Sequence, residues 1–358
     1  MGLTWHRAKP TYVALVLAFL TALGVIALLR LEHVLLIVFV SVLFAAALSG
    51  PTARLEQWHV PSAVSVPLIY LTTLAALVLL LWLITPPLFA QLAGFADEAP
   101  KYAERYRGLR ESYNDIREHY PSLASFDQQV SRLGSSIFKR VGERAVGLPS
   151  DLFRVFLDLL SVFVISTLLV SSRRRILAFI LSLVHPDYRD ETRDVLTKMW
   201  TRIGFYVRAK VIVMFIVGVL MYVALRLIGV PFAVPLSIIV ALGEIIPRAG
   251  PWLARIPLLG IAALDGWKPF VLTLVASVAI ENLKGLVISP LVEGQQLDIH
   301  PLAVFISVLV GGSLFGVGGA VVAVPAAALL QVLAEEVVIP WRQRQLALAG
   351  EPPLPPEA

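Results

Sequence analysis

The 358-residue sequence contains no cysteine, few charged residues and none of the short motifs that mark common enzyme sites. Without cysteine there can be no disulfide, thiolate metal site, iron–sulfur cluster or cysteine nucleophile. The six histidines are scattered along the chain, so we expect no metal site and no cofactor. The absence of HExxH, GxSxG and phosphate-binding GKS motifs argues against an intramembrane metalloprotease and an ATP-driven pump. An enzyme is therefore the least favoured class.

Charged residues make up only 15% of the chain and hydrophobic residues 58%, with a mean hydropathy of +0.80. Soluble domains carry about 25% charged residues. Because the apolar residues form several separate runs, at about 20 residues per span they predict an all-α polytopic membrane protein with about eight transmembrane helices. The net charge of +5 fits cytoplasmic Lys and Arg beside the headgroups of a lipid bilayer. No basic stripe interleaved with aromatic residues is present, so we expect no nucleic-acid partner.

Residues 1–90 hold the first three predicted spans. The first span follows a short basic segment but ends without a small-residue cleavage site, so we interpret it as a transmembrane helix rather than a signal peptide. We expect the second to end at Ser49-Gly50-Pro51. The third should stop near Pro86-Pro87, because two consecutive prolines cannot continue a regular helix. The predicted spans are about Tyr12–Leu29, Val34–Leu48 and Val60–Leu83.

Residues 91–150 are charged and predict an extramembrane helical insert. Tyrosine and aliphatic residues recur at alternating spacings of four and three between Tyr102 and Tyr120, as in the seam of a short coiled coil. A second amphipathic stripe runs from Phe126 to Val141. The two stripes either bury against each other in a helical hairpin or pack between the subunits of a homo-oligomer.

Residues 151–340 contain the remaining spans, and the polar, proline-rich residues 341–358 predict a disordered tail. A polar surface helix is expected over Asp187–Lys210. The apolar stretch Pro231–Leu264 is interrupted near 244–257 and is either a broken span or a re-entrant hairpin. The other spans are expected at Leu152–Val170, Val211–Ile228, Pro269–Leu291 and within Pro301–Val338.

The distribution of basic residues predicts the orientation, because Lys and Arg are enriched in loops that stay in the cytoplasm. Arg173–Arg175 and the Lys198–Lys210 cluster are therefore assigned to the cytoplasm, together with both termini. The same scheme places Gln91–Ser150 outside. It also places Glu293–His300 outside, since that loop has no Lys or Arg.

The span Pro269–Leu291 carries Glu281 and Lys284 close to its middle. Its apolar residues favour insertion by roughly 5 kcal/mol, whereas each charged side chain opposes insertion by about 2.5–3.5 kcal/mol. Thr273 and Ser277 precede the charged pair at helical spacing, so the four residues make one polar stripe that should not face lipid. Either Glu281 and Lys284 neutralise each other within the bundle, or the stripe lines a translocation route.

The interruption near 244–257 carries Glu244, Arg248 and Arg255 among several prolines. Prolines remove backbone donors, and transporters use exposed helix ends at membrane depth to coordinate ions and polar solutes. Alternatively, the segment lies at the membrane surface, where Arg248 and Arg255 meet lipid headgroups. The candidate residues for the helix break are Pro247, Gly250, Pro251 and Pro257.

A glycine-rich region interrupts the last apolar run. Small residues four apart let helices approach closely, so close packing is the first interpretation and a moving hinge the second. The candidate residues are Gly311, Gly312, Gly316 and Gly319.

Three ordered motifs resemble the AI-2E family of bacterial membrane proteins, which is named for autoinducer-2 export. They are Ile246-Pro-Arg-Ala-Gly-Pro251, Leu297-Asp-Ile-His-Pro301 and the glycine-rich element that leads into Ala323-Val-Pro325. The resemblance covers nearly the whole chain and implies a transporter of the bacterial inner membrane. Family members often carry a Gln/Glu pair where Glu281 and Lys284 stand, so here an ammonium replaces a carboxylate.

These features predict a transporter whose pathway is lined by Glu244, Arg248, Arg255, Glu281 and Lys284. The resemblance implies either export of a small signalling molecule or exchange of a monovalent cation for protons. We favour gradient-driven efflux of a small polar solute. The alternatives are Na⁺/H⁺ antiport with Glu281 as the titrating group, and a non-transporting scaffold whose 91–150 insert binds a partner.

Overall fold

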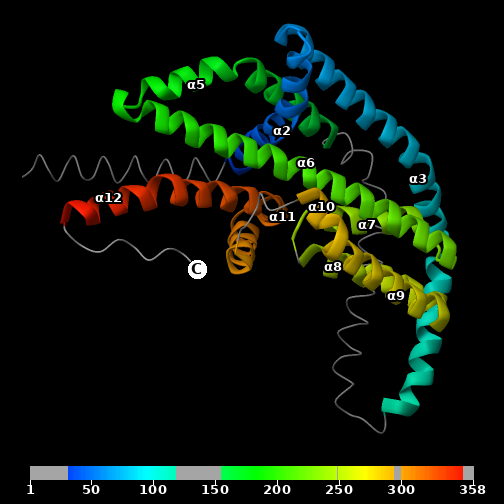
Figure 1. The fold of residues 1–358 in the computed structure, drawn as a ribbon. Helices are drawn as coiled ribbons and strands as arrows, with labels where there is room; N and C mark the ends of the chain where they lie inside the picture. Colours follow the sequence, from blue (N-terminus) through cyan, green and yellow to red (C-terminus); the bar gives the residue numbers. More distant parts are fainter. Residues whose placement is uncertain (1–30, 118–154, 248, 294–299, 350–358) are drawn as a thin grey trace, which may run out of the picture.

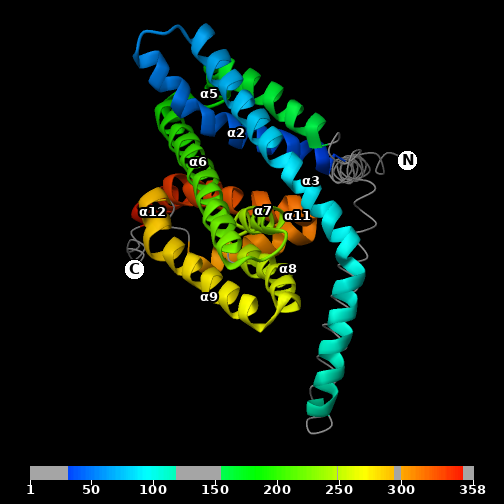
Figure 2. The same ribbon diagram turned by 90° about the vertical axis from the view of Figure 1, so that its right-hand side faces the viewer.

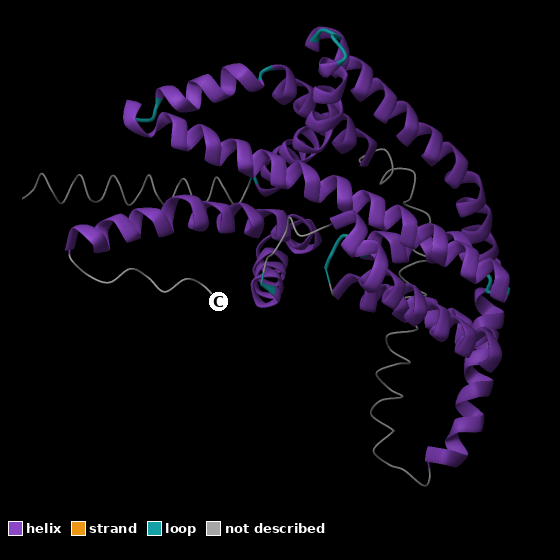
Figure 3. Cartoon of the chain, viewed as in Figure 1, coloured by secondary structure: helices purple, strands orange, loops and turns teal. Residues whose placement is uncertain are grey.

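In the computed structural model, the described residues are 31–117, 155–247, 249–293 and 300–349. Helices joined by short loops make up this part of the chain, with no strand among them (Figure 3). Five of these helices are long and apolar enough to cross a membrane, or six when the bent pair Val155–Ser171 and Arg173–Ser182 is one span. The all-α, polytopic class is therefore confirmed. The predicted total of about eight includes the span at 12–29, which lies outside the described residues.

Helix α2 (Glu32–Gln57) continues through Pro51, so the predicted end of the second span at this residue is wrong. Proline removes the N–H that would bond the carbonyl of Ala47, four residues earlier. Arg208 of α6 donates to that carbonyl instead, with an Nη1–O distance of 2.7 Å. Because the freed acceptor has a new partner, the helix can continue.

Helix α3 (Ser62–Arg117) likewise runs through Pro86 and Pro87, so the third span does not end there. The two prolines free the carbonyls of Trp82 and Leu83, whose side chains are exposed. The helix curves rather than ends (Figure 1). The first helix of the predicted insert is thus a direct extension of the third span, and the second stripe at 126–141 lies outside the described residues.

Helix α6 (Arg189–Ile228) is a single 40-residue helix, not a surface helix followed by a separate span. It follows α5 (Arg173–Ser182) and the 3₁₀ turn η1 (Pro186–Tyr188). It lies at the centre of the fold and packs against α2 and against the helices that follow it (Figures 1 and 2). Its buried residues recur every four positions, which gives one apolar stripe toward the C-terminal helices: Val213, Val217, Met221 and Leu225.

Two short helices, α7 (Ala233–Gly243) and α8 (Ala249–Asp265), replace a single broken span. They pack against each other across a break at residues 244–248. A Cβ atom on Gly243 would lie 2.9 Å from the carbonyl oxygen of Gly250, so the close approach requires glycine. The stretch Pro231–Leu264 therefore contains two packed helices, and its path relative to the membrane stays a prediction.

The break is shorter than the predicted 244–257. Pro251 lies in the first turn of α8, where backbone N–H groups have no partner within the helix. Pro257 lies inside α8 and does not interrupt it, so its assignment as a break residue is wrong. Only Pro247 falls within the break itself, where its carbonyl accepts from Ala249 N–H at 2.7 Å.

Helix α9 (Trp267–Leu283) passes into a π-helical turn, η2 (Lys284–Ile288), and then into α10 (Ser289–Glu293). This segment returns the chain to the middle of α6, where Lys210 Nζ lies 3.9 Å from a carboxylate oxygen of Glu293. Two residues this close cannot lie on opposite sides of a membrane. The prediction that Lys210 is cytoplasmic while Glu293 lies outside is therefore wrong.

Helix α11 (Pro301–Leu333) is kinked at Phe315 and Gly316, where Gly316 has a φ of +60°. Its two halves meet where Gly311 faces Gly319, and a Cβ on Gly311 would collide with the Gly319 backbone. The close approach therefore joins Gly311 and Gly319, which are eight positions apart rather than the expected four.

The chain continues through the π turn η3 (Ala334–Val338) into α12 (Ile339–Ala349). The first part of the predicted disordered tail is thus helical. Lys198 and Arg202 of α6 pair with Glu336 and Glu335 of η3 at 2.7 and 3.2 Å. These two ion pairs hold the end of the chain against the first half of α6.

Candidate functional site

Four of the five predicted pathway residues meet in one ion network. Lys284 Nζ donates to both carboxylate oxygens of Glu244 at 3.0 Å and to Glu281 Oε1 at 2.6 Å. Arg255 Nη2 donates to Glu281 Oε2 at 3.1 Å. The fifth residue, Arg248, lies outside the described residues.

Three consecutive elements position these side chains. Glu244 follows the last residue of α7, at the start of the break. Arg255 lies in α8, one helix further on. Glu281 and Lys284 lie three residues apart at the end of α9, and therefore on one face of that helix. Because the chain turns at the break, Glu244 after α7 and Arg255 in α8 both lie next to the charged residues of the α9 segment.

The network is charge-neutral and mostly buried. The side chains of Glu244, Arg255 and Lys284 are 2%, 9% and 12% exposed. Removing one partner from such a buried pair costs about 3–5 kcal/mol, because a charge is left without compensation. Glu281 is 36% exposed, so the network opens to the surroundings on its side.

Arg255 is held by two further contacts. Its guanidinium lies 4.8 Å from the ring centroid of Trp252, and it donates to the carbonyl of Ser277 at 3.4 Å. Thr273 and Ser277 of the predicted polar stripe are fully buried. The Thr273 hydroxyl has no hydrogen-bond partner among the described residues. Thr273, Ser277 and Arg255 thus lie in the protein interior.

The glycine-rich candidates do not join the network. Gly250 and Pro251 form the start of α8 beside it, whereas α11 packs mainly on α6 and α2. The α11 glycines, listed as Gly311, Gly312, Gly316 and Gly319, therefore shape a kink away from the charged residues.

Sequence reasoning missed a second ion pair beside the network, Lys210 with Glu293. Lys210 had been assigned to a surface helix and Glu293 to an external loop. Their positions in the sequence could have indicated them, because each residue borders a long apolar run. Nowhere among the described residues do three or more His, Asp or Glu side chains gather in a way that could hold a metal ion.

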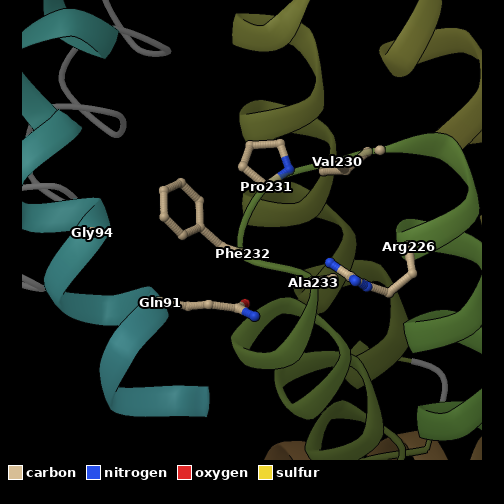
Figure 4. Close-up of a pocket in the computed structure, with 8 residues that line it drawn as sticks. Gln91, Gly94, Arg226, Val230, Pro231, Phe232 and Ala233 are labelled. Carbon is tan, nitrogen blue, oxygen red and sulfur yellow. The ribbon is translucent and has the colours of Figure 1, made fainter.

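A cavity of about 400 Å³ lies apart from the network, between α3 and the turn that joins α6 to α7 (Figure 4). Gln91 spans this junction, and its Oε1 accepts from Val234 N–H at 3.0 Å. The cavity contains none of the predicted pathway residues. We place the candidate site at the ion network, because three of its four charged side chains are at most 12% exposed and burying such charges is costly. The cavity is lined by Gln91, Gly94, Arg226, Gly229, Val230, Pro231, Phe232 and Ala233.

Comparison with known proteins gives one family over most of the chain. The AI-2E family transporter model matches residues 13–339. YueF of Bacillus subtilis is 23% identical over 325 residues, covering 86% of this chain and 88% of YueF. PerM of Escherichia coli is 24% identical, covering 97% of this chain and 99% of PerM. The AI-2 transport protein TqsA of Escherichia coli is 22% identical, covering 92% of this chain and 95% of TqsA. Since the family model spans both the ion network and the helices that build it, this multi-pass membrane protein belongs to the AI-2E transporter family.

Proposed function

We propose that this chain exports a small polar solute across the bacterial inner membrane, driven by an ion gradient, with both termini in the cytoplasm. The observation that supports the proposal most is the four-residue network of Glu244, Arg255, Glu281 and Lys284. Ionised groups within apolar helices are costly, and in transporters they mark the route of polar solutes. The homo-oligomer stays a prediction.

The network suits a solute that exchanges hydrogen bonds. Its charges cancel, so it attracts neither cations nor anions over a long range. Glu281 is the most exposed member. The Thr273 hydroxyl, about two turns earlier in α9, is buried without a hydrogen-bond partner among the described residues. A solute with hydroxyl or carbonyl groups can replace one hydrogen bond at a time without leaving a bare charge.

The antiporter alternative gains no support from this geometry. An antiporter would need a carboxylate that can exchange its partners for a sodium ion or a proton, but both oxygens of Glu281 accept hydrogen bonds from cations, Lys284 and Arg255. The scaffold alternative depends on the 91–150 insert, much of which lies outside the described residues.

Transport of AI-2 tests the proposal, since the relative TqsA is an AI-2 transport protein. Inside-out membrane vesicles that contain the wild-type protein should accumulate AI-2 under a sodium or proton gradient and without ATP. Lys284→Gln should abolish most of this uptake. Lys268→Gln, the same change at an exposed lysine at the start of α9, is the matched control and should leave uptake unchanged.

Absence of gradient-dependent uptake by the wild-type protein would contradict AI-2 export. Normal uptake by Lys284→Gln would remove the network from the pathway. Sodium-dependent pH changes in the same vesicles would favour the antiporter instead.

A further inference from the structure

The ion pair between Lys210 and Glu293 differs from every contact within the network beside it. Its N–O distance is 3.9 Å, whereas the network contacts measure 2.6 to 3.1 Å. Its side chains are 17% and 31% exposed. Lys284 makes three short hydrogen bonds, whereas Lys210 has a single long ion pair among the described residues. The ammonium of Lys210 therefore keeps N–H groups that a ligand can use.

The π turn η2 explains how Glu293 reaches this position. Nine residues separate Lys284 from Glu293, and at about 100° per residue an α-helix would point them in opposite directions. A π turn contains about one extra residue, which rotates everything after it by about 100°. The turn at Lys284–Ile288 thus swings Glu293 toward the side of α6, where Lys210 lies.

Lys210 also lies close enough to the network to interact with its charges. It interacts with the charges of Glu293, Glu244, Lys284 and Glu281. Tyr206, one turn earlier on α6, interacts with Glu293 as well. Charged groups thus lie within electrostatic range of their neighbours from Arg255 in α8 to Glu293 at the end of α10. The three carboxylates are balanced by three cations, so this longer line is still neutral.

We propose that Lys210 and Glu293 form a second binding position for the solute, at the mouth of the route that the network lines. This inference rests on the proposed function. The wide pair opens to admit a hydroxyl or carbonyl group, and either group can accept from the Lys210 ammonium. A hydroxyl can also donate to the Glu293 carboxylate. When the solute leaves, the two side chains compensate each other again.

Cysteine accessibility tests the position directly, because the native chain contains no cysteine. Lys210→Cys and Glu293→Cys would each be treated with a water-soluble methanethiosulfonate reagent in membrane vesicles. Val213→Cys is the matched control, since Val213 lies on the same helix and is fully buried. We expect rapid modification at positions 210 and 293, slow modification at 213, and at least a threefold slowing at 210 and 293 in the presence of AI-2, a difference of about 0.7 kcal/mol.

Charge exchange tests the pair by transport. Lys210→Glu and Glu293→Lys each place like charges together, so each should lower AI-2 uptake by about tenfold. The double variant restores an opposite-charge pair and should recover uptake to within about threefold of the wild type. Thermal unfolding in detergent, measured for all three variants, separates a loss of transport from a loss of folded protein.

Modification of positions 210 and 293 that is as slow as that of position 213 would overturn the proposal, because the mouth would then be closed to water. If the wild-type protein transports AI-2 but AI-2 does not slow modification of the two cysteine variants, Lys210 and Glu293 do not form a binding position. If the wild-type protein transports no AI-2, the proposed substrate fails. The difference in reactivity between 210, 293 and 213 still decides whether a water-accessible mouth exists.

Discussion

The α7–α8 segment and the α11 segment have similar backbone arrangements, but only the α7–α8 segment contributes charged side chains to the ion network. In each, an apolar stretch folds back on itself through a short break. In each, two glycines permit the backbones to touch, Gly243 with Gly250 and Gly311 with Gly319. The breaks differ in what they carry, since one begins with Glu244 and the other consists of Phe315 and Gly316.

The partner helix makes the second difference. The α7–α8 segment lies against α9, whose stripe supplies Glu281 and Lys284 to complete the network. The α11 segment lies against α6 and α2. A folded-back helix pair can thus place a polar group inside the helix bundle. A charged group there is stabilised only when a facing helix supplies the opposite charge.

The largest expected effect is on the charged segment. Glu244→Gln removes the main partner of Lys284 from a site where Glu244 is 2% exposed. We expect a loss of about 3 kcal/mol in the free energy of unfolding, together with loss of AI-2 uptake. Thermal unfolding in detergent and vesicle uptake would measure the two effects.

The double variant Glu244→Gln/Lys284→Gln is the control for Glu244→Gln. It leaves Glu281 paired with Arg255 at 3.1 Å, so most of the stability should return while uptake stays low. If Glu244→Gln unfolds like the wild type, the carboxylate is not paired as described and the contrast between the two segments disappears.

The individual parts of this site could be predicted from the sequence, but their pairing could not. Charged residues at helical spacing in an apolar span marked Glu281 and Lys284, and clustered prolines marked the break after Glu244. The bond between Glu244 and Lys284 spans forty residues, and no local pattern encodes it. Lys210 and Glu293 were placed on opposite sides because loop charge carries no information about a π turn that redirects the chain.

Proline was the least reliable predictor of where a helix ends. At Pro51, Arg208 satisfies the carbonyl that the proline frees, so α2 continues. Near Pro247, by contrast, the chain turns, and the short loop supplies its own hydrogen bonds, such as Gly250 N–H to Ile246 O at 3.0 Å. At Pro51, therefore, the helix continues with the help of a distant donor, which the local sequence does not reveal.

The second prediction compares the two glycine contacts directly. Gly250→Ala and Gly319→Ala each place a methyl group against facing backbone, so both should lower stability by about 1–3 kcal/mol. Uptake per folded molecule should fall only for Gly250→Ala, because only that change displaces Glu244 and Arg255. Detergent unfolding and vesicle uptake, normalised to folded protein, would separate the two.

Gly260→Ala is the matched control for these variants, because a Cβ at this position in α8 meets nothing within 4 Å. It should stabilise the helix by about 0.5–1 kcal/mol. Equal loss of uptake in Gly250→Ala and Gly319→Ala would mean that both segments belong to the transport route.

The smallest expected effect concerns the polar stripe beside the charged segment. Thr273→Val replaces a buried hydroxyl without a partner among the described residues by a methyl group of similar size. Stability should rise by about 1 kcal/mol, because an unsatisfied buried polar group is removed. If the hydroxyl binds solute, uptake should nevertheless fall about threefold, since a neutral hydrogen bond contributes about 0.5–1.5 kcal/mol.

Ser313→Ala in α11 is the counterpart, because that exposed hydroxyl already donates to the carbonyl of Val310 at 2.9 Å and its loss should affect uptake little. A gain in stability with unchanged uptake would limit the route to the ionised residues and exclude the buried end of the stripe.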